Sequence, residues 1–258
     1  MIEFISTLKK RNKVLFYTGL FSLLGALICS IMFQSDKTLV LGINAWIKPL
    51  KFFLSITAVV WTMAWFMAYL DQRYARKVKI YSWMTLITFS FEMFVIVWQA
   101  ANGRLSHFNI TTPLYASLFS AMGVVIVLYT LWTAYIGLLF FKQKQFSLPE
   151  TYVWGIRIGI LFFVLFSFEG GIMAARFSHT IGNIDGSPGI PLLNWSKQYG
   201  DLRVAHFFGM HGLQIIPLIT YYLCTKRWQV FLFAALYFLF VVVMLIQAFY
   251  QVPFISVS

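Results

Sequence analysis

Four histidines and two glutamates of this chain have side chains that could do chemistry within or beside a bilayer. The histidines all fall toward one end of the apolar segments that contain or adjoin them: His107, His179, His206 and His211. Neutral imidazole is the commonest metal ligand in proteins, and haem iron takes axial histidine. Glu92 and Glu169 lie inside apolar segments, where a carboxylate is costly and therefore a functional candidate.

The spacing of these residues limits how they can cooperate. His206 and His211 are five residues apart, about 140° around a helix, whereas metal-binding pairs on one helix face are four apart. We therefore expect these two histidines to face different partners. Counting the helical rise on from Asp201, and back from His179 if the helix continues that far, places Glu169 and His211 at the same depth, about 15 Å inside. We expect Glu169 to orient His211 or to move protons.

Three arginines complete a candidate cofactor site. Guanidinium groups pair with carboxylates through two hydrogen bonds, so Arg104, Arg176 and Arg203 are suited to haem propionates or to another anionic group. The chain has no Cys-x-x-Cys-His motif for covalent haem attachment. The expected cofactor is therefore haem b or a transition metal ion, in a membrane oxidoreductase whose partner is a small anionic ligand or a quinone.

Two other functions compete with this interpretation. The arginines, with Lys48 and Lys51, could serve a transporter or receptor for a small anionic ligand, with the membrane glutamates relaying protons. A metal-dependent lipid hydrolase would use bound zinc to activate water. The His-x-x-x-His spacing and the Gly-x-Ser-x-Gly elbow typical of hydrolases are absent. A purely structural or assembly role also remains open.

The composition predicts the class of element that must position these residues. Of 258 residues, 60% are hydrophobic and only 11% are charged, against roughly a quarter in ordinary soluble domains. A soluble domain of this composition would expose large apolar patches. The sequence therefore predicts an all-α integral membrane protein embedded in a lipid bilayer.

Seven segments reach the ~20 apolar residues that a spanning helix needs. They lie at approximately 14–33, 47–70, 80–101, 113–141, 152–175, 203–223 and 228–250. We expect one transmembrane domain over residues 1–258, with a long outer loop at 177–202 that could act as a lid. Ser147 and Glu150 form a predicted capping box for the fifth span, and Asp201 is the predicted N-cap of the sixth.

The net charge of +12 is mainly a topology signal. Clusters of Lys and Arg precede the first span and occupy three of the short loops, all on one side of the predicted spans. The positive-inside rule then places the N-terminus inside, the C-terminus outside and every histidine toward the outside. We predict a bacterial-type cytoplasmic (inner) membrane with an outward-facing site, and no binding to nucleic acid.

An internal repeat is predicted from two motifs that recur in the same order. Phe-Ser-Phe-Glu occurs at residues 89–92 and 166–169, and Arg-x-Ser-His follows each copy, at 104–107 and 176–179. Spans three and four therefore look like a diverged copy of spans five and six, running in the same direction. At the positions of His206 and His211, the first copy has Ser117 and Met122.

One resemblance extends from about Glu169 to Pro217. Asn194-Trp195-Ser196, then Gly200-Asp201-Leu202-Arg203, then His206-Phe207 and Gly209-x-His211, resembles a pattern in a family of bacterial polytopic membrane proteins of uncharacterised function. A weaker echo occurs at 46–52 and 98–109. The resemblance implies a seven-span membrane protein, and it implies no activity, cofactor or site residue.

Overall fold

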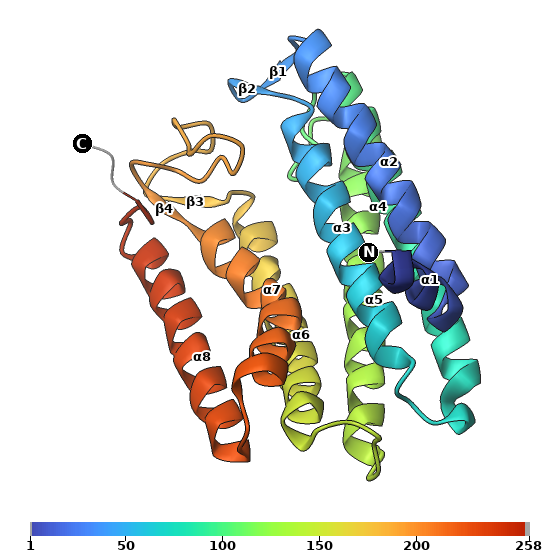
Figure 1. The fold of residues 1–258 in the computed structure, drawn as a ribbon. Helices are drawn as coiled ribbons and strands as arrows, with labels where there is room; N and C mark the ends of the chain where they lie inside the picture. Colours follow the sequence, from blue (N-terminus) through green and yellow to red (C-terminus); the bar gives the residue numbers. More distant parts are fainter. Residues whose placement is uncertain (1, 256–258) are drawn as a thin grey trace. The chain divides into compact units, whose positions relative to one another are not determined.

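The computed structural model describes residues 2–255, and its chain forms two compact units, Met1–Ser147 and Leu148–Ser258 (Figure 1). Unit 1 contains α1 (Ile2–Arg11), α2 (Lys13–Ser35), β1 (Leu39–Val40), β2 (Ile43–Asn44), α3 (Ile47–Met67), the 3-10 helix η1 (Gln72–Tyr74), α4 (Ala75–Ala101) and α5 (Pro113–Lys142). Unit 2 contains α6 (Glu150–Arg176), β3 (Thr180–Ile181), β4 (Gly200–Asp201), α7 (Leu202–Leu223) and α8 (Arg227–Phe249).

The predicted spans are confirmed. Among the described residues, seven helices are long and apolar enough to cross a membrane, from α2 to α8. They match the seven predicted segments to within a few residues at nearly every end, because hydropathy and length alone define such helices. The protein is all-α, and its two-residue strands form only two small antiparallel pairs, β1 with β2 and β3 with β4.

The first helix was not predicted. α1 is too short to span a bilayer, yet it buries Leu8 completely against its unit. Phe4 stacks on Trp65 with ring centroids 5.3 Å apart. Arg11 donates to the Trp65 carbonyl and lies 3.7 Å from the centre of its ring. A short helix with one buried face and basic residues at its end is typical of the membrane interface.

Small residues let neighbouring helices approach closely in both units. In unit 1, the rings of Trp61 and Phe53 on α3 lie where side chains of Gly19 and Gly25 on α2 would otherwise be. Membrane helices associate by such packing because lipid supplies no hydrophobic drive between them. These contacts fix α2 against α3.

The same device joins α6 to α7, which run side by side in Figure 1. Four glycines at this contact have no room for a Cβ without displacing a neighbour: Gly155, Gly159, Gly209 and Gly212. The core of unit 2 is apolar and draws on all three of its helices, including Phe162, Phe166 and Val230. The α6–α7 pair is thus a closely packed frame for any side chain placed on it.

Pro217 lies inside the second half of α7. It has no N–H to donate to the carbonyl of Leu213, and its ring lies against Gly159 of α6. A glycine opposite the proline leaves space for the ring.

The C-terminal end of α6 was predicted to within one residue, but its N-cap was not. The predicted capping box is wrong: Pro149 is the N-cap residue and no side chain caps the helix there. At the other end, the helix stops at Arg176 because Phe177 adopts a left-handed conformation with φ 52°. This end comes three residues before His179, the position from which the depth of Glu169 had been counted.

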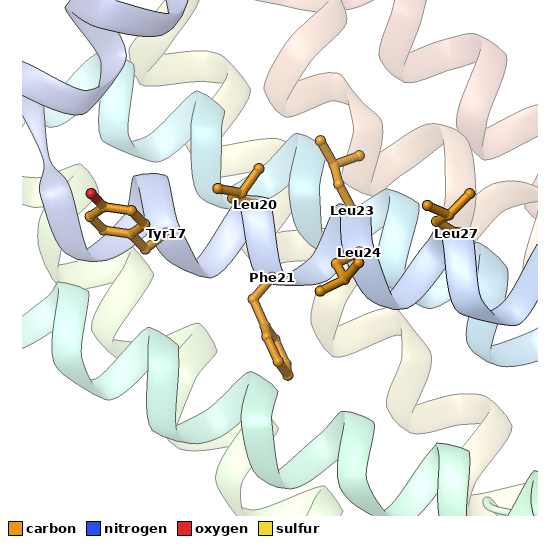
Figure 2. A pocket seen from close by; sticks show the side chains of 6 residues that line it. All are labelled: Tyr17, Leu20, Phe21, Leu23, Leu24 and Leu27. Atoms are coloured by element: carbon orange, nitrogen blue, oxygen red, sulfur yellow. The ribbon is translucent and has the colours of Figure 1, made fainter.

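One surface hollow lies along α2, and its side chains are drawn in Figure 2. It is lined by Tyr17, Leu20, Phe21, Leu23, Leu24 and Leu27. The tyrosine hydroxyl is the sole polar side-chain group in this set. An apolar face of this kind on a candidate membrane span is suited to lipid chains, so it does not define a chemical site.

Candidate functional site

The centre of the candidate site is a hydrogen-bonded pair between α6 and α7. His206 Nδ1 lies 3.1 Å from Glu169 Oε2, and the glutamate side chain is only 7% exposed. The second carboxylate oxygen, Oε1, is buried and has no hydrogen-bond partner among the described residues. The pair therefore combines a carboxylate that can accept a further hydrogen bond with an imidazole that is a quarter exposed.

Gly170 makes room for this imidazole. A Cβ at that position would lie 2.7 Å from His206 Cε1, so a side chain there would displace the ring. The neighbouring Gly171 faces open space, with nothing within 4 Å of the same position. The glycine that shapes the pair is thus Gly170, a role that no sequence pattern indicated.

The partner of Glu169 corrects the sequence prediction. We expected His211, but its Nδ1 lies 3.1 Å from Gln214 Oε1 and its ring packs on Phe207 at 4.4 Å. The depth count had assumed that α6 continues to His179. Since α6 ends at Arg176, Glu169 lies about one turn nearer the helix end, level with His206. The expectation that His206 and His211 face different partners is confirmed.

The loop between α6 and α7 holds a second imidazole–carboxylate pair. His179 Nδ1 lies 2.7 Å from Asp185 Oδ2. The backbone N–H groups of His179 and Thr180 and the hydroxyl of Ser178 also donate to Asp185. Burial opposes ionisation of this carboxyl, but the hydrogen bonds and charge of His179 and the hydrogen bond from Thr180 hold its pKa well below the usual range.

The start of α7 is organised by Asp201, which is buried. It accepts hydrogen bonds from the backbone N–H groups of Ser196 and Arg203, and it pairs with the Arg203 guanidinium through two bonds of 2.9 and 2.6 Å. Arg203 also donates to the Asn194 carbonyl. The predicted N-cap is confirmed, whereas Arg203 is engaged within the loop rather than offered to an external anion.

Aromatic packing fixes the rest of this loop. Trp195 is buried among Phe207, Phe208 and Phe254, with ring centroids 5.5 to 6.0 Å away. The strands β3 and β4 pair Thr180 with Asp201. The 177–202 loop is therefore folded, and aromatic packing and hydrogen bonds hold it against the start of α7.

Of the remaining predicted site residues, His107, Arg104 and Glu92 belong to unit 1, and Arg176 belongs to unit 2. His107 lies just beyond α4, with Nδ1 3.1 Å from Ser106 Oγ and its ring beside Phe52 at 5.8 Å. Arg104 donates to the Tyr115 hydroxyl and lies over that ring. In unit 2, Arg176 is exposed at the end of α6. The structure thus distributes the three predicted arginines over different surroundings.

Glu92 is buried on α4, and its Oε1 has no hydrogen-bond partner among residues 2–255. Gln99 Oε1, two turns further along the helix, is buried and unpartnered in the same way. The ammonium group of Lys48, at the start of α3, interacts electrostatically with Glu92.

The predicted metal ligands do not gather into a polydentate site. Within the part of the chain that the structure describes, no group of three or more His, Cys, Asp or Glu side chains is placed to hold a metal ion. What unit 2 does bring together are single pairs, His206 with Glu169 and His179 with Asp185.

Comparison with known proteins adds nothing to the class of protein that the fold indicates. No protein-family model matches the chain, and no curated protein or solved structure matches it either. The class is an all-α membrane protein with seven candidate spans, and its functional assignment rests on the geometry of the site.

Asp185 gives a pH prediction for the 177–202 loop. Because its pKa is lowered in the folded protein, its bonds stabilise the loop fully above the ordinary Asp pKa of about 3.9, and this stabilisation is lost as pH falls below that value. We expect Asp185→Asn to lower the free energy of unfolding by about 1–3 kcal/mol at pH 7.

Thermal unfolding in detergent, followed by Trp fluorescence, measures this difference as a function of pH. The gap between wild type and Asp185→Asn should narrow below about pH 4. Asp71→Asn is the control, since the Asp71 side chain is half exposed and pairs at the surface with Arg73. A gap that stays constant down to pH 2 would contradict the role of the ionised carboxylate.

Proposed function

We propose that the protein is a proton-coupled membrane transporter in which a small anionic solute moves together with a proton, and that Glu169 and His206 bind and release that proton. The observation that carries this proposal is their 3.1 Å hydrogen bond within the apolar α6–α7 frame, next to a carboxylate oxygen with no protein partner among the described residues. Ionisable groups inside membrane helices are typical of proton relays and substrate pathways.

The chemistry of coupling follows from charge. Taking up one proton makes the Glu169–His206 pair more positive by one charge, which favours an anion nearby in a medium of low dielectric constant. Releasing the proton removes that attraction. Arg176 lies two turns beyond Glu169 at the exposed end of α6, where its guanidinium would attract an anion before it reaches the pair.

A second candidate function, a membrane oxidoreductase with haem b or a metal ion and a quinone or small anionic partner, is favoured by one observation. Glu169 engages Nδ1 of His206 and leaves Nε2 as the ligand nitrogen, an arrangement common among metal-binding histidines. A haem iron needs one or two axial histidines, so His206 could serve. A non-haem ion, or the zinc of a lipid hydrolase, would need more ligands than the described residues bring together.

Orientation and location are part of the same proposal. The basic loops support an N-terminus inside a bacterial-type cytoplasmic membrane, with the Glu169–His206 pair opening outward. Paired reporters fused after residue 258, one active only inside and one only outside, test this. An inside C-terminus would reverse the direction in which the site opens.

The deciding experiment uses purified protein in liposomes that contain a pH-sensitive dye. Under an inward proton gradient, we expect at least one of lactate, phosphate and sulfate to accelerate proton entry. If no anion in such a panel changes proton entry, and the purified protein shows a Soret band that His206→Ala removes, the haem function replaces transport. Elemental analysis for bound zinc, iron and copper accompanies the spectrum.

Gly170 and Gly171 offer a matched pair of substitutions in this assay. Gly170→Ala is expected to push the His206 ring away from Glu169 and to slow coupled proton entry about tenfold, since small misplacements of a reacting group are costly. Gly171→Ala adds the same methyl group where nothing lies within 4 Å, and should leave the rate unchanged.

Protein stability separates this effect from misfolding. The displaced ring is the far end of a side chain, so the melting temperature of Gly170→Ala should stay near that of Gly171→Ala. Equal proton-entry rates in the two variants would show that the position of the imidazole does not matter.

A further inference from the structure

Unit 1 contains a row of buried polar side chains that the proposed transport site in unit 2 does not use. At 3.6 residues per turn, five side chains of α4 fall within an arc of about 60°. They are Tyr81, Thr85, Thr88, Glu92 and Gln99, and all five are buried. From first to last they extend over about 27 Å, close to the ~30 Å thickness of a bilayer's hydrocarbon core.

The end of this row nearest the start of α4 is a hydroxyl cluster. The Tyr81 hydroxyl lies 2.9 Å from the Tyr129 hydroxyl and 3.1 Å from Thr133 Oγ1, both on α5. All three residues are at most 2% exposed. Thr85 and Thr88 continue the row toward Glu92, each about one turn from the next polar position.

Glu92 is the acidic group of this row. It is 3% exposed, and its Oε1 lacks a hydrogen-bond partner among the described residues, as does Gln99 Oε1 further along the same face. Between them, the face is closed by Val95 and Ile96, which are fully or almost fully buried. On the Tyr81 side of Glu92 a polar side chain therefore recurs about every turn, whereas on the other side apolar side chains separate Glu92 from Gln99.

We propose that Glu92 is a second proton-binding site, in unit 1, reached from the N-terminal end of α4 along the Tyr81–Thr88 hydroxyls. One proton enters at the hydroxyl cluster, each hydroxyl passes one proton on as it receives another, and the Glu92 carboxylate becomes a neutral carboxylic acid. Release reverses these steps and leaves every hydroxyl neutral. The charged group associated with Glu92 is Lys48, whose ammonium offsets the carboxylate's charge between proton uptakes.

Infrared spectroscopy of the full-length protein in lipid tests this directly. The carbonyl stretch of a protonated carboxylic acid should be present in wild type and in Glu169→Gln, absent in Glu92→Gln, and should shift when the solvent is changed to D₂O. Because the band belongs to Glu92 itself, this readout does not depend on transport through Glu169 and His206. A band that is unaffected by Glu92→Gln, or that never exchanges, overturns the proposal.

The route is tested by the rate of that D₂O shift. Tyr81→Phe and Thr133→Val should each slow it at least about tenfold, since each removes one proton-carrying hydroxyl. Thr130→Val is the control: it is buried on the same helix and its hydroxyl bonds the carbonyl of Ile126, as that of Thr133 bonds the carbonyl of Tyr129, but Thr133 also lies 3.1 Å from the Tyr81 hydroxyl. Unchanged exchange in both Tyr81→Phe and Thr133→Val, with Glu92 still titrating, overturns the assigned route.

Discussion

Replacing Asp201 by alanine is expected to lower the free energy of unfolding of unit 2 by about 3 kcal/mol. The substitution removes the N-cap of α7 and leaves the Arg203 guanidinium without its carboxylate. It also leaves the buried N–H of Ser196 without its acceptor. Breaking a buried ion pair by deleting one partner is costly because the remaining charge stays desolvated, and a lost N-cap adds about 1 kcal/mol.

Equilibrium unfolding in mixed detergent micelles, with Trp fluorescence as the probe, measures this change. Trp195 reports on the affected region because it is buried against the N-terminal turns of α7. Asp71→Ala is the control: its pair with Arg73 is exposed, and such pairs contribute under about 1 kcal/mol. A loss for Asp201→Ala no larger than that of the control would show that the loop does not depend on this carboxylate.

The largest functional effect is expected from Glu169→Gln, which should lower anion-coupled proton entry at least about 100-fold. Glutamine has nearly the same shape, and its carbonyl can still accept the hydrogen bond from His206 Nδ1. It cannot take up a proton in the range where a carboxylate does. The fold should therefore survive while the coupling is lost, and His206→Gln should act in the same direction.

Glu150→Gln is the matched control for this result. Glu150 is the first residue of the same helix, but its side chain is 66% exposed and pairs weakly with Arg227 at 3.5 Å. Its substitution should leave proton entry unchanged. Should Glu169→Gln transport as fast as the wild type, the coupled proton must be carried elsewhere in the molecule.

Most of the fold followed from the sequence because a bilayer restricts the alternatives. Hydropathy and length predicted all seven long helices, and Thr112 and Asp201 cap α5 and α7 with side-chain oxygens. The short α1 was missed because its apolar residues are too few for a span. Its position depends on contacts with residues far along the chain, such as Trp65.

The site was harder to predict, because one turn of helix decides which side chains meet. The sequence indicated Glu169 and the α7 histidines, but α6 ends three residues before His179, and the glutamate meets His206 rather than His211. The predicted span already ended at residue 175, but the depth count extended the helix to His179. Likewise, Arg203 looked suited to an anion, and only the folded loop shows that Asp201 already engages it.

The internal repeat remains a prediction. The glutamates of its two Phe-Ser-Phe-Glu motifs can be compared directly. Glu92 and Glu169 each have a buried oxygen that lacks a protein partner among the described residues. They differ in their surroundings: Glu169 has an imidazole at 3.1 Å, whereas Glu92 has the more remote charge of Lys48. If the duplication is real, one copy gained a histidine where the other has Ser117.

Pro217 is a point at which α7 can bend. A helix is stiff because of its backbone hydrogen bonds. Pro217 cannot make the bond to the Leu213 carbonyl, so α7 should bend most easily there. Both α7 histidines lie between Asp201 and Pro217, and the proline ring lies against Gly159 of α6. Flexure of α7 is therefore expected to swing His206 and His211 as one piece, stretching or compressing the contact with Glu169.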